Sequence, residues 1–168
     1  MSYRQLMPRW QYLVLVPLLV MVYMMVIQAW QPFQVALAKA LWWMPAAILN
    51  PLPDDGAQTY AAPVLLMTAI VRVVCTGVVA PFAEELYFRG YLLPHIDRLG
   101  VGAPVLNAVL LACYHLWTAL LNPGRALAWL PTVYLVWRKR NITLGIAVHI
   151  LLNLIGVIGP LIGPMASG

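Results

Sequence analysis

Long uncharged apolar runs constrain this chain more than any other feature of its sequence. Residues 10–30 contain no charged side chain and are bracketed by Trp10 and Trp30. A helix of that length reaches about 31 Å, enough to cross a bilayer core, and tryptophan anchors helices at both interfaces. Because 63% of the 168 residues are hydrophobic and only 9% are charged, the sequence predicts an all-α, polytopic transmembrane helical bundle that forms one integral-membrane domain over residues 1–168.

The other apolar runs bring the expected total to about five to six membrane segments. We expect residues 63–80, 103–121 and 142–162 to span, with the charged helix following residues 63–80. Residues 33–49 contain a lysine and a proline, so this segment either crosses, re-enters or lies at the interface. Residues 126–137 are short for a span, about 18 Å as a helix, and cross only with help from neighbouring helices.

The positive charges predict how the chain is oriented. If residues 33–49 do not cross, one side of the membrane collects Arg4, Arg9, Arg98 and the basic cluster at residues 138–140. Loops rich in arginine and lysine stay in the cytoplasm, so this arrangement predicts five crossings and a cytoplasmic N-terminus. The net charge of +5 thus reflects topology, and we expect no nucleic-acid binding.

Residues 81–94 place charge where the rest of the chain avoids it. Glu84, Glu85 and Arg89 fall within six positions, although an ionised group inside a membrane costs from about 2.5 to more than 10 kcal/mol. Glu85 and Arg89 are four residues apart and share a helical face, whereas Glu84 is rotated by about 100° from Glu85. We interpret the first two as a supporting ion pair and Glu84 as the working carboxylate. Pro81 predicts a kink or a new helix start.

Two histidines and an asparagine have depths that suit a common site with Glu84. Measured by helical rise from one side, Glu84 lies about 16 Å in, His115 about 18 Å and His149 about 10 Å. Asn153 follows His149 by four residues and shares its face. Each histidine alone is equally well explained as a packing residue, but the four groups together predict one cavity.

Such a set supports hydrolysis. A carboxylate shielded from water is a stronger base, so Glu84 can take a proton from a water molecule that one histidine helps to hold. The other histidine and Asn153 can donate hydrogen bonds to the oxyanion, each worth about 3 to 4 kcal/mol. We expect no required cofactor, although glutamate with two histidines is also a zinc ligand set; against zinc, there is no His-Glu-x-x-His motif and the ligands come from three helices.

The order of these motifs resembles that of the CPBP intramembrane proteases, which include the CAAX prenyl endopeptidases and bacterial bacteriocin-processing and self-immunity proteins. The motifs are Glu84-Glu85-x-x-x-Arg89, His115 and His149-x-x-x-Asn153, and the resemblance covers a catalytic core of about residues 81–154. It implies that Glu84 is catalytic and that His115 activates the water. It also implies that His149 and Asn153 serve the oxyanion, with Glu85 and Arg89 in support.

These observations predict an intramembrane endopeptidase of glutamate type, or a metal-dependent one, that cleaves a membrane-associated protein or peptide. Its partners would be that substrate and the lipid bilayer, and the expected location is the bacterial inner membrane. The alternative is a non-catalytic immunity or scaffold protein of the same family. A proton-coupled transporter is a third hypothesis, but the small size and the lack of repeated halves argue against it.

Overall fold

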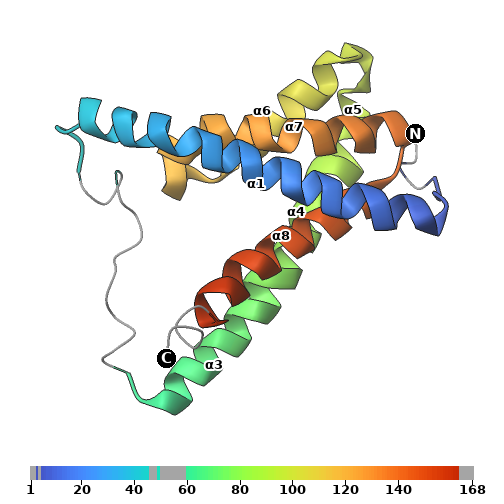
Figure 1. Cartoon of the computed structure of the whole chain (residues 1–168). Coiled ribbons are helices and arrows are strands. Elements are labelled where there is room, and N and C mark those ends of the chain that lie inside the picture. The colour runs from blue at the N-terminus through green and yellow to red at the C-terminus, as the bar shows by residue number, and fades with distance from the viewer. Residues whose placement is uncertain (1–2, 4, 46–48, 50–59, 163–168) are drawn as a thin grey trace.

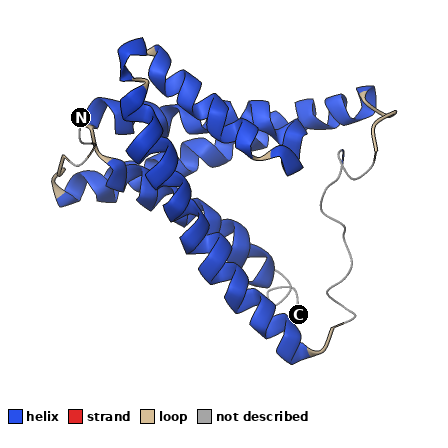
Figure 2. Ribbon diagram, turned by 180° about the vertical axis from the view of Figure 1, so that it is seen from behind, coloured by secondary structure: helices blue, strands red, loops and turns tan. Residues whose placement is uncertain are grey.

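The computed structural model describes residues 3, 5–45, 49 and 60–162. Every secondary-structure element in those ranges is a helix, which confirms the predicted all-α class (Figure 2). In chain order the elements are α1 (Arg9–Ala40), α3 (Ala62–Arg72), η2 (Val73–Val79), α4 (Ala80–Glu85), η3 (Leu86–Leu92), α5 (Leu93–His95), η4 (Asp97–Leu99), α6 (Gly102–Tyr114), η5 (Leu116–Leu121), α7 (Asn122–Lys139) and α8 (Ile142–Ile162). Of these, η2 and η3 are π-helical and η4 and η5 are 3-10 helices.

The first helix is longer than predicted. α1 joins residues 10–30 to the beginning of the segment at 33–49, which we expected to be separate. Only Gln31 and Pro32 lie between the two apolar runs, and neither ends the helix, since no glycine, asparagine or aspartate follows to cap it. At 32 residues, α1 is about 48 Å long and exceeds the ~30 Å hydrocarbon core, so it must tilt or extend beyond it. Residues 46–48 lie outside the described ranges.

The helical run that carries Glu84 extends from Ala62 to His95, and within it the α-helical element α4 starts at Ala80 with Pro81 in its first turn, where the sequence predicts a kink or a new helix start. The π-helical turn η2 lies immediately before this proline, and the Ala80 N–H bonds the Cys75 carbonyl five residues back. A π turn widens the helix and changes which carbonyls need donors, so the chain accommodates a ring that lacks an N–H. The charged motif is therefore held in one rigid element.

The region around His115 also differs from the prediction. α6 ends at Tyr114, so His115 is not inside a helix but at its C-terminal end, with φ −86° and ψ 61°. The His115 carbonyl accepts hydrogen bonds from the Thr118 N–H at 3.1 Å and from the Asn122 Nδ2 at 3.2 Å, so it is satisfied although α6 has ended. α7 then starts at Asn122, with Pro123 in its favoured first turn, and has 18 residues where the sequence predicted 12.

Two groups of helices cross in the fold. α1 and α7 run antiparallel side by side with α6 behind them, and α8 packs along α4 and η2 at a steep angle to that layer (Figure 1). Among the described residues, three helices are long and apolar enough to cross a membrane: Arg9–Ala40, Ala62–His95 and Ile142–Gly159. The protein is thus an all-helical integral membrane protein.

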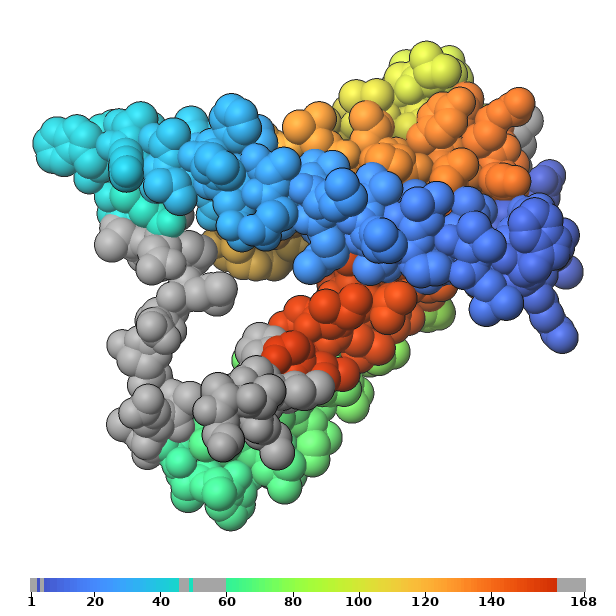
Figure 3. Space-filling view, in the orientation of Figure 1, coloured from blue at the N-terminus to red at the C-terminus, as the bar shows by residue number. Residues whose placement is uncertain are grey.

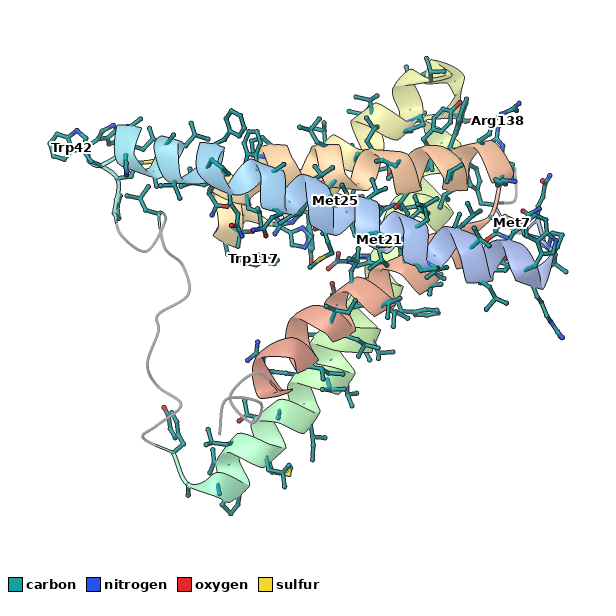
Figure 4. The ribbon with its side chains drawn as sticks, in the orientation of Figure 1. Met7, Met21, Met25, Trp42, Trp117 and Arg138 are labelled. Carbon is teal, nitrogen blue, oxygen red and sulfur yellow. The ribbon has the colours of Figure 1, made fainter. Side chains whose placement is uncertain are left out.

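The N-terminal residues are tied to the turn between α7 and α8. The Ile142 N–H donates to the Tyr3 carbonyl at 2.9 Å, and the Gln5 N–H donates to the Arg140 carbonyl at the same distance. The N-terminal residues and the basic cluster at 138–140 therefore lie at the same end of the molecule, as predicted, and Figure 4 shows Met7 and Arg138 at that end and Trp42 at the opposite end. That this end is cytoplasmic stays a prediction.

The buried core lies where the two groups of helices cross. Trp129 and Val133 of α7 pack there with Leu144 and Val148 of α8, and Leu19 of α1 closes the cluster. α4 packs against α8 beside this core, where Glu85 is fully buried and Glu84 is partly exposed.

Candidate active site

Glu84 lies between the two histidines that the sequence pairs with it. Its Oε2 is 3.9 Å from the Nε2 of His115 and 3.8 Å from the Nε2 of His149. The Glu84 side chain is 15% exposed, and its Oε2 has no hydrogen-bond partner among the described residues. These separations are too long for direct hydrogen bonds but suit one water molecule that contacts all three groups.

The position of His115 at the end of α6 fixes which ring nitrogen meets Glu84. Its Nδ1 lies 2.9 Å from the Leu111 carbonyl, which can only accept, so in the neutral ring Nδ1 carries the hydrogen. The Nε2 that faces Glu84 is then an acceptor. Since the helix stops one residue earlier, the ring is turned into the space beside α4 and does not follow the face of α6.

His149 links the two adjacent carboxylates. Its Nδ1 is 2.9 Å from the Oε1 of Glu85, and its Nε2 points toward Glu84. The ring also packs edge-on against Trp129, with ring centroids 4.5 Å apart. The imidazole is thus fixed on three sides, with one nitrogen directed to each glutamate.

Glu85 and Arg89 form the ion pair that their spacing predicts. The Arg89 Nη1 lies 2.8 Å from the Glu85 Oε1, and both side chains are fully buried. The guanidinium also lies over the Trp129 ring, 4.8 Å from its centroid. A Cβ on Gly145 would collide with the Glu85 Oε2, so only glycine lets α8 approach α4 this closely. Glu85 therefore orients His149, and Arg89 balances the charge of Glu85.

Asn153 lies further along the same wall. Its Nδ2 donates to the Thr76 carbonyl at 2.9 Å, so α8 is attached here to the π turn ahead of the motif. One amide hydrogen of Asn153 is thus engaged, and the other is free for a substrate. The role of Asn153 at an oxyanion stays a prediction.

These groups line one cavity of about 690 Å³. Glu84, His115, His149 and Asn153 all belong to its lining, together with Tyr23 of α1. The cavity therefore draws on four parts of the fold that are distant in sequence. Figure 3 shows an opening between α1 and α8 on this face, and Trp117 of η5, labelled in Figure 4, belongs to the cavity lining.

Sequence reasoning missed Trp129, Gly145 and Arg125. Arg125 lines the cavity, although it is not among the predicted site residues. The signal was present, because an arginine in a charge-poor helical protein is a site candidate by the same argument as Glu84. Neither Trp129 nor Gly145 carried such a signal, since both residue types are common in apolar helices.

The donor atoms fit a zinc ion in type and less well in spacing. Tetrahedral nitrogen and oxygen ligands lie about 2.0 to 2.1 Å from zinc and thus about 3.4 Å from one another. The two measured separations are 3.8 and 3.9 Å, and no three His, Cys, Asp or Glu side chains of the described ranges are arranged as metal ligands. Glu84, His115 and His149 would have to close by about 0.5 Å to hold the metal.

The fold and the site define a polytopic helical membrane protein with a carboxylate and two histidines gathered in a cavity between its helices. The family comparison is more specific, because residues 66–155 match the family described as type II CAAX prenyl endopeptidase Rce1-like. This match covers more than half of the chain, which therefore belongs to that family, and it confirms the resemblance to the CPBP proteases. The matched range contains all six predicted site residues. No curated protein and no solved structure matches the chain.

Proposed function

We propose that the protein is an intramembrane endopeptidase in which Glu84 and the two histidines activate a water molecule. The observation that carries this proposal is the placement of the Glu84 Oε2 between two Nε2 atoms, at 3.8 and 3.9 Å, within a cavity. A water molecule in that position donates one hydrogen to the carboxylate and another to the Nε2 of His115. Its lone pair is then directed at a substrate carbonyl.

The chemical steps balance on these residues. Glu84 takes a proton from the water as the oxygen attacks the carbonyl carbon, which gives a tetrahedral oxyanion. His149, when protonated on both nitrogens, donates Nδ1–H to Glu85 and has Nε2–H free for that oxyanion, and the second amide hydrogen of Asn153 can join it. Protonated Glu84 then gives its proton to the departing amine as the C–N bond breaks, and the site returns to its initial state.

A bound zinc ion would lie among the same three side chains and would polarise the water. The expectation of no required cofactor is tested by dialysis against a strong chelator, with metal content measured by mass spectrometry beside activity. A catalytic metal leaves with the chelator and activity falls, whereas a glutamate and histidine site keeps its activity.

The family supports a peptide or protein substrate at the membrane. As a first probe we choose an S-farnesylated peptide with a C-terminal C-a-a-X sequence, because that is the substrate type in the family's description. The bacterial inner membrane is the location that the resemblance to bacterial members favours.

The decisive experiment replaces Glu84 in protein reconstituted into lipid nanodiscs. Glu84→Gln keeps the size of the side chain and removes its ability to accept a proton, so hydrolysis should fall by at least ~100-fold. His115→Ala should give a similar loss. Elution volume and melting temperature serve as the control for folding, and both should match the parent.

Cleavage at the parental rate by Glu84→Gln would remove this residue from the mechanism. The immunity or scaffold hypothesis makes the opposite prediction, namely that cells producing Glu84→Gln keep the full phenotype.

A further inference from the structure

Arg125 is a buried cation with no ion-pair partner among the described residues. It lies in the first turn of α7, is only 8% exposed and lines the same cavity as Glu84 and His115. No carboxylate of the described ranges is within ion-pair distance of it; the arginine ion pairs there are those of Arg89 and Arg140. A guanidinium inside a membrane protein is costly unless an anion compensates it, so this residue calls for a ligand.

The surrounding contacts hold Arg125 in place without neutralising it. Its Nη1 donates to the Asn122 Oδ1 at 2.6 Å, and the Asn122 Nδ2 donates to the His115 carbonyl at 3.2 Å. An amide oxygen accepts a hydrogen bond but brings no negative charge. Arg125 is therefore linked through Asn122 to the backbone of a proposed catalytic histidine, and its guanidinium makes no ion pair within the described ranges.

The cavity as a whole has a positive excess. Among its lining residues the charged side chains are Arg72, Arg125 and Glu84, so the cations outnumber the carboxylate. Arg72 is exposed at the end of α3, whereas Arg125 is buried, which makes Arg125 the stronger site because its charge is less screened by water. The planar fork of an arginine matches the two oxygens of a carboxylate.

We propose that Arg125 binds the C-terminal carboxylate of the substrate and so selects chains that end close to the cleaved bond. This inference rests on the proposed peptidase function and names its specificity residue. A terminal carboxylate is the one anion that every C-a-a-X substrate carries, whichever residue occupies the last position. Binding it would balance the buried guanidinium and, through Asn122, would hold the His115 backbone in its working position.

The test compares two peptides that differ only at their ends. A fluorescent S-farnesylated C-a-a-X peptide is prepared with a free C-terminal carboxylate and with a C-terminal amide. Binding is measured by fluorescence anisotropy to Glu84→Gln protein in nanodiscs of zwitterionic lipid, so that no turnover interferes. We expect the acid to bind about 10- to 100-fold more tightly than the amide, the range for hydrogen bonds to a charged partner.

Adding Arg125→Gln should remove this preference. The affinity for the acid should fall to that for the amide, and the affinity for the amide should not change. Arg125→Lys keeps a charge without the fork and should retain part of the preference. Arg98→Gln, in an exposed turn outside the cavity, is the matched control and should keep the whole preference. With cleavage-competent protein, the loss should lie mainly in KM for the acid.

Several results would overturn the proposal. The first is that the protein with Arg125 binds the acid and the amide equally tightly. The second is that Arg125→Gln weakens the binding of both peptides equally. The third is that anionic phosphatidylglycerol abolishes the preference for the acid, which would make a lipid phosphate the ligand. If Arg125→Gln does not fold, the parental preference and Arg125→Lys still decide. Preferential binding of the acid without any cleavage by the Glu84-containing protein would refute the proposed function, and only the binding of a terminal carboxylate by Arg125 would then stand.

Discussion

The two ends of the molecule are both built from helices and pack very differently. At the N-terminal end, side chains from three parts of the chain form a polar network around Asp97. Arg140 pairs with it at 2.9 Å and Trp137 donates to it at 2.6 Å, while the Tyr3 ring lies 4.8 Å from the Arg140 guanidinium. Asn141 adds hydrogen bonds to the Gln5 carbonyl and the Tyr12 hydroxyl. We call this the packed end.

At the opposite end, the helices diverge. α3 has no buried residue, and the part of α8 beside it leaves the α1 and α7 layer (Figure 1). Apolar side chains such as Leu66 and Met67 are more than 60% exposed there. In a bilayer, lipid covers such surface, so this open end needs no protein partner to be stable. The catalytic candidates lie between the two ends, fixed from the packed side and accessible from the open side.

The largest expected effect concerns the Glu85–Arg89 pair, which lies between the two ends, and tests whether this pair is as buried as the structure indicates. Arg89→Ala leaves the fully buried Glu85 without its cation, which typically costs about 3 to 5 kcal/mol. The free energy of unfolding, measured by denaturant titration in mixed micelles, should fall by that amount. Activity should fall as well, because Glu85 orients His149.

Arg72 offers a matched control from the open end. It is an exposed arginine without an ion pair among the described residues, so Arg72→Ala should change stability by no more than about 0.5 kcal/mol. Equal losses for the two variants would show that burial does not distinguish the two arginines, and the comparison between the ends would fail.

Most of the fold, and the proximity of the candidate site residues to one another, could be predicted from the sequence. Apolar runs gave the class, the charge bias placed the N-terminus beside residues 138–140, and the rarity of charge singled out Glu84, Glu85 and Arg89. Helical spacing was sufficient for the ion pair because a helix has a fixed geometry. His115, His149 and Glu84 were predicted to meet only on the basis of their depth, and the structure brings them together.

Helix boundaries and close contacts could not be predicted. The π turn before Pro81 and the end of α6 at Tyr114 depend on which side chains are near enough to satisfy freed carbonyls, and Asn122 does so only in the folded chain. The need for glycine at position 145 likewise arises from Glu85, which lies 60 positions earlier in the sequence. Such requirements are tertiary and leave no local pattern.

A second, smaller effect tests the close contact between α8 and Glu85 in the same region. Gly145→Ala places a methyl group against Glu85, and overpacking of this kind costs about 1 to 3 kcal/mol, partly offset by about 1 kcal/mol from the better helix propensity of alanine. Gly156→Ala, on the same helix but with no atom within 4 Å, receives only the propensity gain. Gly145→Ala should thus be less stable than Gly156→Ala by about 1 to 3 kcal/mol in the same titration. Indistinguishable variants would mean that α8 moves freely away from Glu85.

The smallest effect concerns the packed end alone. The hydrogen bond from Arg140, followed by that from Trp137, holds the pKa of Asp97 below its ordinary value. Burial raises the pKa of Tyr3 to about 12. The hydrogen bond to Asp97 raises the pKa of Arg140. Tyr3 is therefore neutral and Arg140 is charged throughout the acid range in which Asp97 titrates. Because ionised Asp97 is favoured in the fold, its contribution is complete above about pH 4 and is lost as the pH falls through the lowered pKa.

Asp97→Asn should therefore lower stability at pH 7 by about 1 kcal/mol or less, as for other accessible ion pairs, and the difference from the parent should shrink below about pH 4. Melting temperatures of both proteins between pH 3 and pH 7 measure this convergence. The binding of the farnesylated peptide at pH 7 should be unchanged, because the network lies away from the cavity lining. A variant that loses peptide binding together with stability would show that the packed end and the open end are coupled and that the cavity depends on the whole network around Asp97.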